Sequence, residues 1–236
     1  GTRMRSERPK TLHTVLGKPI VQWIVEAFAK VPACQAPMVV LGFGAPEVRA
    51  ALGQSSTYVE MQELSGTATA VKDALAVLAG DLPVVIVNGD DPFIRPESIQ
   101  KLIDTHAVAQ EPLVIGTIEV RDFDDWRKTF SHFGRIVREG GVVTSIIEYK
   151  NATEEQKLIR EVNPNVFCVD MAWLRGVVGR IERNEVTGEY HLTDLVALAV
   201  QDGKPIETVA LSPEEGYGIN SPEDLAEAEL IAAKLG

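Results

Sequence analysis

Short β-branched runs alternate with longer amphipathic stretches through the first half of the chain, and this alternation constrains the fold more than any other feature. Apolar runs at 37–43, 57–61, 83–89 and 112–120 predict strands. Between them, apolar residues recur at helical spacing over 19–31, 45–52, 66–80 and 97–107. Strands that alternate with helices favour a mostly parallel sheet with helices on both faces. The pattern therefore predicts an α/β fold.

The second half of the chain departs from this simple alternation. Three further apolar runs, at 135–139, 142–149 and 161–170, predict strands, and the Gly140-Gly141 pair between the first two is typical of a hairpin turn. Two late helices are predicted at about 191–202 and 222–235, the second with Ser221 as its N-cap. We therefore expect one domain over residues 1–236, with an antiparallel excursion inserted into the α/β frame.

Composition and charge limit the classes of molecule that the chain can be expected to bind. The chain is 45% hydrophobic and 24% charged, as an ordinary globular protein is, and it carries a formal net charge of -11. Nucleic-acid binding is disfavoured because it needs a basic face. No apolar run has the 18 or more residues of a spanning helix. We expect a cytoplasmic location without a membrane partner, and we interpret Cys34 and Cys168 as core residues.

Positive charge is concentrated at the start of this acidic chain. The segment GTRMRSERPK contains four cations, Arg3, Arg5, Arg8 and Lys10. A solvated basic tail is the better interpretation on charge alone. The alternative is a polyphosphate site, because Arg3 supplies a planar fork of donors and Lys10 a point charge. The further motifs along the chain favour this second interpretation.

Two motifs follow predicted strands at positions where α/β sheets bind ligands. The strand at 83–89 leads into Asp90, so a carboxylate is expected at the ligand-binding edge of the sheet, and Asp90 is the first candidate for a metal ligand. The alternative is a simple turn in which Asp91 caps the next element. Gly66 and Thr67 begin a predicted helix, where free N–H groups can meet phosphate or base; the alternative there is an ordinary capped loop.

Other catalytic patterns are poorly supported. His13, His106, His132 and His191 show no spacing typical of a metal set or a triad, and we assign them no chemistry. Neither a GxSxG motif nor a GxxxxGK[ST] loop occurs in the sequence. Serine hydrolases and P-loop enzymes are therefore disfavoured.

Taken together, these motifs resemble the sugar-phosphate nucleotidyltransferases. The first ten residues are similar to the second half of that family's glycine-rich signature. Over nearly the whole chain, further stretches come in the order and spacing seen in the bacterial uridylyltransferases acting on N-acetylglucosamine 1-phosphate: KTLHTVLGKPIVQW, VNGDDPFI, FGRIVREGGVVTSIIEYKNATEEQ, EVNPN, GEYHLTD and GIN. The resemblance implies a Rossmann-like α/β/α sandwich with a mixed, mostly parallel central sheet, an antiparallel sugar-binding excursion and the nucleotide-diphospho-sugar transferase topology.

The resemblance also implies a reaction and a set of site residues. UTP and N-acetylglucosamine 1-phosphate would give UDP-N-acetylglucosamine and pyrophosphate by in-line attack, with Mg²⁺ as cofactor and no covalent enzyme intermediate. The implied roles are as follows: phosphate binding and catalysis by Arg3 and Lys10; nucleotide binding by Gly1, Thr2, Gln62, Gly66, Thr67, Asn88 and Gly89; sugar binding by Gly134, Glu148 and Asn163; Mg²⁺ binding by Asp90 and Asn220. One Mg²⁺ requires the side chains of Asp90 and Asn220 to lie within about 7 Å of each other.

The sequence differs from the family pattern at several positions. The glutamine expected to contact the base is Met61 here, and Gln62 can replace it only if the strand bulges or ends early. Asn163-Pro164-Asn165 stands in place of Asn-Thr-Gly, and Asn88-Gly89-Asp90 in place of Tyr-Gly-Asp. These differences leave the base and the sugar open.

The chain is also shorter than the family pattern. The family's first strand and the start of its glycine-rich loop are missing, so we expect this sequence to be part of a longer chain, and no residues correspond to a C-terminal β-helix acetyltransferase domain. Two alternatives stay open: a related enzyme with another base or sugar 1-phosphate, and a non-catalytic sugar-nucleotide-binding subunit. The sequence predicts no oligomeric state.

Overall fold

The computed structural model describes residue 4 and residues 6–235, which form eight α-helices, eleven strands and several short 3₁₀ turns. The helices are α1 (Ile20–Ala29), α2 (Ala45–Leu52), α3 (Thr67–Leu75), α4 (Pro96–Ala109), α5 (Glu154–Lys157), α6 (Met171–Val177), α7 (Asp194–Gln201) and α8 (Pro222–Leu235). The strands are β1 (Thr14–Val15), β2 (Lys18–Pro19), β3 (Met38–Leu41), β4 (Thr57–Glu60), β5 (Val84–Ile86), β6 (Leu113–Glu119), β7 (Gly134–Glu139), β8 (Val142–Ile147), β9 (Glu161–Asn163), β10 (Phe167–Val169) and β11 (Ile206–Ala210).

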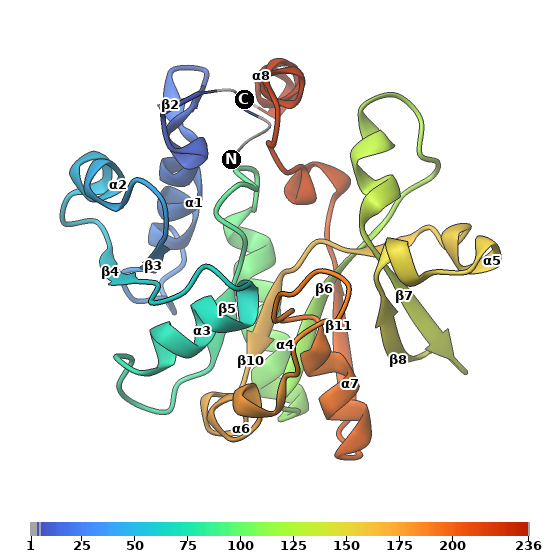
Figure 1. Cartoon of the computed structure of the whole chain (residues 1–236). Helices are drawn as coiled ribbons and strands as arrows, with labels where there is room; N and C mark the ends of the chain where they lie inside the picture. Colours follow the sequence, from blue (N-terminus) through green and yellow to red (C-terminus); the bar gives the residue numbers. More distant parts are fainter. Residues whose placement is uncertain (1–3, 5, 236) are drawn as a thin grey trace.

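A seven-stranded mixed sheet forms the centre of the molecule (Figure 1). Its order is β5-β10-β6-β9-β7-β8, and β11 pairs in parallel with β6. Strand β10 is antiparallel to both of its neighbours, so β5, β6 and β11 all run in one direction. Strands β3 and β4 pair in parallel in a separate two-stranded sheet. The α/β fold and its antiparallel excursion, made of β7, β8 and β9, are confirmed. The expectation of a mostly parallel central sheet is wrong, because among the described strands of this sheet only β6 and β11 pair in parallel.

The core consists of apolar side chains on both faces of the central sheet. Strand β6 is buried along six of its seven residues. Its residues Leu113 and Ile115 belong to a cluster with residues of α6 and α7, whereas Val114 belongs to another cluster with residues of α1 and α4. Because successive side chains of a strand point to opposite faces, helices cover both sides of the sheet. The sandwich arrangement follows from this continuous apolar run.

The local predictions were confirmed in part. Gly140 and Gly141 have φ of 57° and 87° and join β7 to β8, as expected of a hairpin turn. The single strand predicted at 161–170 was wrong, because it is divided into β9 and β10. Pro164 lacks an amide donor and Asn165 adopts a left-handed φ of 59°, which together end β9. The sequence pattern also failed to indicate α6 and β11.

Within the described part of the chain, no helix has the length and apolar character needed to cross a membrane.

Candidate active site

Lys10, Asp90 and Asn220 are far apart in the sequence but meet in the structure. Lys10 begins a 3₁₀ turn (Lys10–Leu12), Asp90 follows β5, and Asn220 precedes α8. The Lys10 ammonium donates hydrogen bonds to Asp90 Oδ2 at 2.6 Å and to Asn220 Oδ1 at 3.0 Å. Both oxygens lie within 3.0 Å of one nitrogen, so they cannot be further apart than twice that distance. The condition for shared metal coordination by Asp90 and Asn220 is therefore met.

The backbone around Asn220 is fixed by the start of α8. Ser221 Oγ accepts a hydrogen bond from the Asp224 amide at 3.1 Å, which confirms Ser221 as the N-cap. The Asp224 carboxylate in turn accepts a hydrogen bond from the backbone amide of Asn220 at 2.9 Å. One residue earlier, the Ile219 amide donates to the Asp90 carbonyl at 3.0 Å. The cap and this backbone bond together hold Asn220 beside Asp90.

The oxygens of Asp90 and Asn220 suit a hard divalent cation. Mg²⁺ commonly takes one or two protein oxygens and completes its octahedral shell with water and substrate phosphates. Among the described residues, no group of three or more His, Cys, Asp or Glu side chains could hold a metal. A bound Mg²⁺ would thus depend on the substrate for several of its ligands. Lys10 supplies positive charge at the same point, which suits an anionic substrate.

The loop before α3 is clamped by the segment around Tyr190. Gly66 has φ of 122° and ψ of 176°, a conformation that essentially only glycine adopts. A Cβ at Gly66 would lie 2.4 Å from the Tyr190 carbonyl oxygen. The Tyr190 carbonyl accepts from the Ala68 amide at 3.0 Å, and Thr67 Oγ1 accepts from the Leu192 amide at 2.9 Å. The Ala68 amide is therefore already bound by the protein, contrary to the expectation of free N–H groups at this helix start.

Asn88 and Gly89 follow β5 on the way to Asp90. The Asn88 amide nitrogen donates to Asp91 Oδ2 at 3.0 Å and lies 3.5 Å from the Pro164 carbonyl oxygen. A Cβ at Gly89 would be 3.6 Å from Thr11 Cγ2, an ordinary contact, so packing alone does not require glycine there. Asp91 is 5% exposed, and its burial, together with the charge of Asp90, raises the pKa of the Asp91 carboxyl well above its usual value.

The three predicted sugar-binding residues lie together on the antiparallel excursion. Gly134 begins β7 and pairs with Asn163 of β9. Glu148 follows β8, and its Oε1 atom lies 3.7 Å from where a Cβ on Gly134 would be. Thr193, a buried residue that the sequence analysis did not single out, donates a hydrogen bond to the same Oε1 at 3.2 Å. The side chain of Asn163 is bound to Asn165 through both its amide oxygen and its amide nitrogen.

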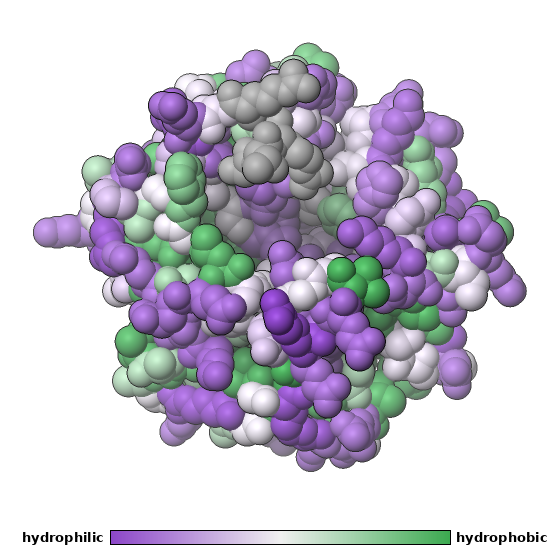
Figure 2. Space-filling model, viewed as in Figure 1, coloured by the Kyte–Doolittle hydropathy of each residue, from purple (hydrophilic) through white to green (hydrophobic). Residues whose placement is uncertain are grey.

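A depression of about 340 Å³ adjoins this group. Glu148 lines it together with His132, Thr187 and His191. The His191 ring is held by a 2.7 Å hydrogen bond to Thr187 Oγ1. Figure 2 shows that the face viewed there is hollowed near its middle and that mainly hydrophilic residues surround the recess. Polar side chains, among them Thr187 and His191, line the depression beside Glu148.

The remaining predicted residues have different outcomes. Strand β4 ends at Glu60, so the strand ends early enough for Gln62 to replace the expected glutamine. Gln62 is exposed, and its backbone amide donates a hydrogen bond to the Asp73 carboxylate at 2.9 Å. Its contact with a base stays a prediction. The predicted phosphate- and nucleotide-binding residues Gly1, Thr2 and Arg3 lie outside the described residues.

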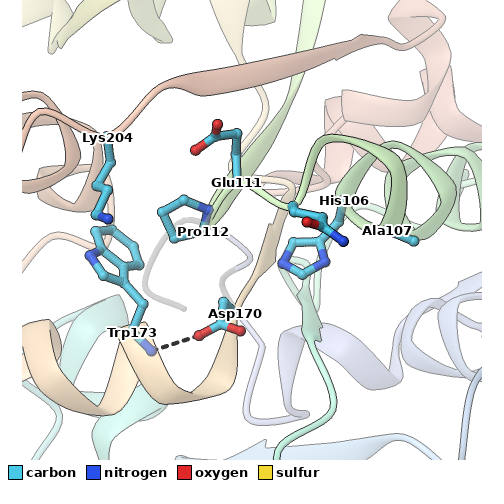
Figure 3. A pocket seen from close by; sticks show the side chains of 8 residues that line it. His106, Ala107, Glu111, Pro112, Asp170, Trp173 and Lys204 are labelled. Atoms are coloured by element: carbon cyan, nitrogen blue, oxygen red, sulfur yellow. Dashed lines mark hydrogen bonds between the residues drawn. The ribbon is translucent and has the colours of Figure 1, made fainter.

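A second depression, about 400 Å³, lies at the opposite edge of the sheet, and Figure 3 shows the side chains that line it. Pro112, Asp170 and Lys204 line it, beside the starts of β6 and β11 and the end of β10. Asp170 accepts a hydrogen bond from the Trp173 amide at 2.7 Å and so caps α6. None of the residues predicted from the sequence to bind substrate or metal lines this depression, so it is not the candidate active site.

Comparison with known proteins identifies the family of the chain. Residues 1–162 match the family model described as the MobA-like NTP transferase domain. The chain belongs to this family. It is 38% identical over 234 residues to the bifunctional protein GlmU of Geobacillus sp. (strain WCH70), covering 98% of this chain and 49% of that protein. It is 36% identical over 233 residues to the bifunctional protein GlmU of Methylobacillus flagellatus, covering 98% and 48%. The chain thus spans about half the length of these curated relatives.

Solved structures show the same fold at low sequence identity. A UDP-glucose pyrophosphorylase complexed with UDP-glucose aligns with a TM-score of 0.72 and 17% identity, over 97% of this chain and 91% of that one. A putative glucose-1-phosphate thymidylyltransferase from Bacillus anthracis aligns with a TM-score of 0.73 and 16% identity, over 96% and 87%. The fold of this chain is therefore that of nucleotide-sugar pyrophosphorylases.

Proposed function

We propose that this chain is a nucleotidyltransferase domain that makes UDP-N-acetylglucosamine and pyrophosphate from UTP and N-acetylglucosamine 1-phosphate. The observation that carries the proposal is the convergence of Lys10, Asp90 and Asn220 at the end of β5. A cation, a carboxylate and an amide oxygen at one point suit a metal-bound triphosphate. The motif resemblance and the similarity to the GlmU proteins support the choice of base and sugar.

In the proposed reaction, a phosphate oxygen of the sugar phosphate attacks the α-phosphorus of UTP. The bond from the α-phosphorus to the bridging oxygen breaks, and pyrophosphate leaves. Because the nucleophile is already an anion, no general base is needed. The domain contributes mainly position and charge. Mg²⁺ held by Asp90 and Asn220 would neutralise phosphate charge.

The side chains of the site have distinct parts in this scheme. Lys10 lies between the two proposed metal ligands and would move its contact to a phosphate oxygen when the metal binds. Arg3 would add a second cation. The loop at Gly66 and Thr67, with Gln62, would meet the uracil base, and Gly134, Glu148 and Asn163 would meet the sugar. The proposal includes a cytoplasmic location, where nucleoside triphosphates are available.

A substrate panel tests this assignment. The purified domain would be incubated with Mg²⁺, each of four nucleoside triphosphates and either N-acetylglucosamine 1-phosphate or glucose 1-phosphate, and products would be identified by mass. We expect UDP-N-acetylglucosamine as the main product. A different nucleotide sugar as the main product would support the proposed reaction class but exclude the proposed substrates. No nucleotide sugar from any pair, with binding of UDP-N-acetylglucosamine retained, would favour the non-catalytic subunit.

A further inference from the structure

The side-chain amide of Asn88 has a fixed orientation. Its nitrogen faces Asp91 Oδ2 at 3.0 Å and the Pro164 carbonyl oxygen at 3.5 Å. The Pro164 carbonyl oxygen can only accept hydrogen bonds. The Asn88 side-chain nitrogen, and not its oxygen, must therefore face Pro164, which settles the orientation of the amide group. No hydrogen bond from a described residue reaches Asn88 Oδ1. Asn88 therefore has only an acceptor to offer to a ligand.

Asp91 is a buried acid whose side chain accepts a hydrogen bond from the Asn88 amide. It is 5% exposed, and burying a carboxyl group is costly unless the group is hydrogen-bonded. The capping role considered for Asp91 from the sequence is wrong, because within the described residues the Asp91 carboxyl accepts a hydrogen bond from the Asn88 side chain and none from a backbone amide. A Cβ on Gly218 would come within 2.9 Å of Asp91 Oδ1, so the neighbouring glycine leaves room for this carboxyl.

Asn88 lies where phosphate and sugar chemistry would meet. It precedes Asp90, the proposed metal ligand, by two residues, and it contacts Pro164, the neighbour of Asn163 in the proposed sugar group. Phosphate oxygens are hydrogen-bond acceptors at neutral pH, so Asn88 Oδ1, which is also an acceptor, cannot form a hydrogen bond with them. A hydroxyl group can donate to Asn88 Oδ1, and both substrates of the proposed reaction carry hydroxyls on their sugar rings.

We propose that Asp91 is a positioning residue that makes Asn88 an acceptor for a ring hydroxyl of one substrate, and so a specificity-determining contact. This inference rests on the proposed function. The hydroxyl belongs either to the ribose of the nucleotide or to the hexose of the sugar phosphate. Asp91 acts on this hydroxyl through Asn88, so removing Asp91 should weaken the same hydroxyl contact that removing Asn88 abolishes.

The test compares kcat/KM for complete and deoxygenated substrates. The ribose arm uses 2′-deoxy- and 3′-deoxy-UTP, and the hexose arm uses N-acetylglucosamine 1-phosphate analogues that lack one ring hydroxyl. In the unaltered protein, one analogue should be turned over about five- to tenfold less efficiently, the effect of one net hydrogen bond. Asn88→Ala should remove that preference, and Asp91→Ala should reduce it. Asp91→Asn, which keeps an acceptor oxygen, should restore most of it.

The effect should appear mainly in KM for the substrate that carries the hydroxyl. Asp170→Ala is the matched control, because it removes a carboxylate that caps α6 at the other edge of the sheet and should leave the preference unchanged. Unchanged preference in Asn88→Ala would overturn the proposal even if Asp91→Ala fails to fold, and so would equal use of all the analogues by the unaltered protein. If the unaltered protein neither binds nor converts UTP, the proposed function itself fails.

Discussion

Replacing Gly66 by alanine tests how the loop before α3 is held. Gly66 combines φ of 122° with ψ of 176°, which costs an L-residue of order 1–3 kcal/mol. The added Cβ would also lie 2.4 Å from the Tyr190 carbonyl oxygen and 2.7 Å from its amide nitrogen. Both neighbours are backbone atoms, so the loop and the Tyr190 segment must separate, at an overpacking cost of about 1–3 kcal/mol. The expected loss in unfolding free energy is the sum of the two, about 2–6 kcal/mol.

Urea denaturation of the variant and of a matched control would measure this loss. Gly203→Ala is the control, because Gly203 has φ of 63° and nothing within 4 Å of an added Cβ. It should cost only about 1–2 kcal/mol, the strain of a left-handed residue alone. Gly66→Ala should also raise KM for UTP, because the displaced loop includes Thr67. The reasoning would be refuted if Gly66→Ala were no more destabilising than Gly203→Ala.

Three further predictions concern the cap of α8, an ion pair and the metal. Ser221→Ala should lower the unfolding free energy by about 1 kcal/mol, measured by urea denaturation, and Ser221→Asp should lose little, since Asp also caps. Burial tends to raise the pKa of Glu161, but the 2.7 Å hydrogen bonds from Arg138, a hydrogen bond from Thr117 and the charge of Arg138 together outweigh burial and lower that pKa below its usual 4.5. The ion pair of Glu161 with Arg138 therefore adds about 1 kcal/mol to the unfolding free energy above pH 4.5, and this contribution is lost as the pH falls through the lowered pKa of Glu161. The stability gap between the unaltered protein and Glu161→Gln should accordingly shrink on acidification, and a gap independent of pH would contradict this. Chelation with EDTA should abolish pyrophosphate release while leaving the thermal midpoint nearly unchanged, and full activity in EDTA would exclude the proposed metal role.

Much of the fold was predictable because its elements follow local patterns. The β6 run is apolar at almost every position, as a strand buried on both faces must be, and Gly140-Gly141 directly indicates the hairpin between β7 and β8. The division of 161–170 was less visible, because the apolar pattern continues across Pro164 and Asn165. Strand β11 was missed because only Ile206 and Val209 of its five residues are buried, so its burial does not follow the regular alternation of a half-buried strand.

The site was predictable as a set of residue types but not as a geometry. Asp90 was identified from its place after a strand, and Asn220 and Glu148 from the motif resemblance. Their partners could not be identified in the same way. Thr193 reaches Glu148 over 45 residues, and Lys10 reaches Asn220 over 210, so only the tertiary fold defines those contacts. The sequence contained a signal for Asp91, because the acidic pair Asp90-Asp91 follows β5, but Asp91 was interpreted as the cap of a turn.

The most direct test of the account is pyrophosphate release with UTP, N-acetylglucosamine 1-phosphate and Mg²⁺, in the unaltered protein, Asp90→Asn and Asp170→Asn. Both variants replace a carboxylate by an amide of the same shape, and the asparagine side chain in Asp170→Asn would still cap α6. The account predicts release by the unaltered protein and by Asp170→Asn, and a loss of at least about a hundredfold in Asp90→Asn, as for one electrostatic group at the reacting phosphates. Equal rates in all three proteins would contradict the assignment of Asp90 to the metal and phosphate site.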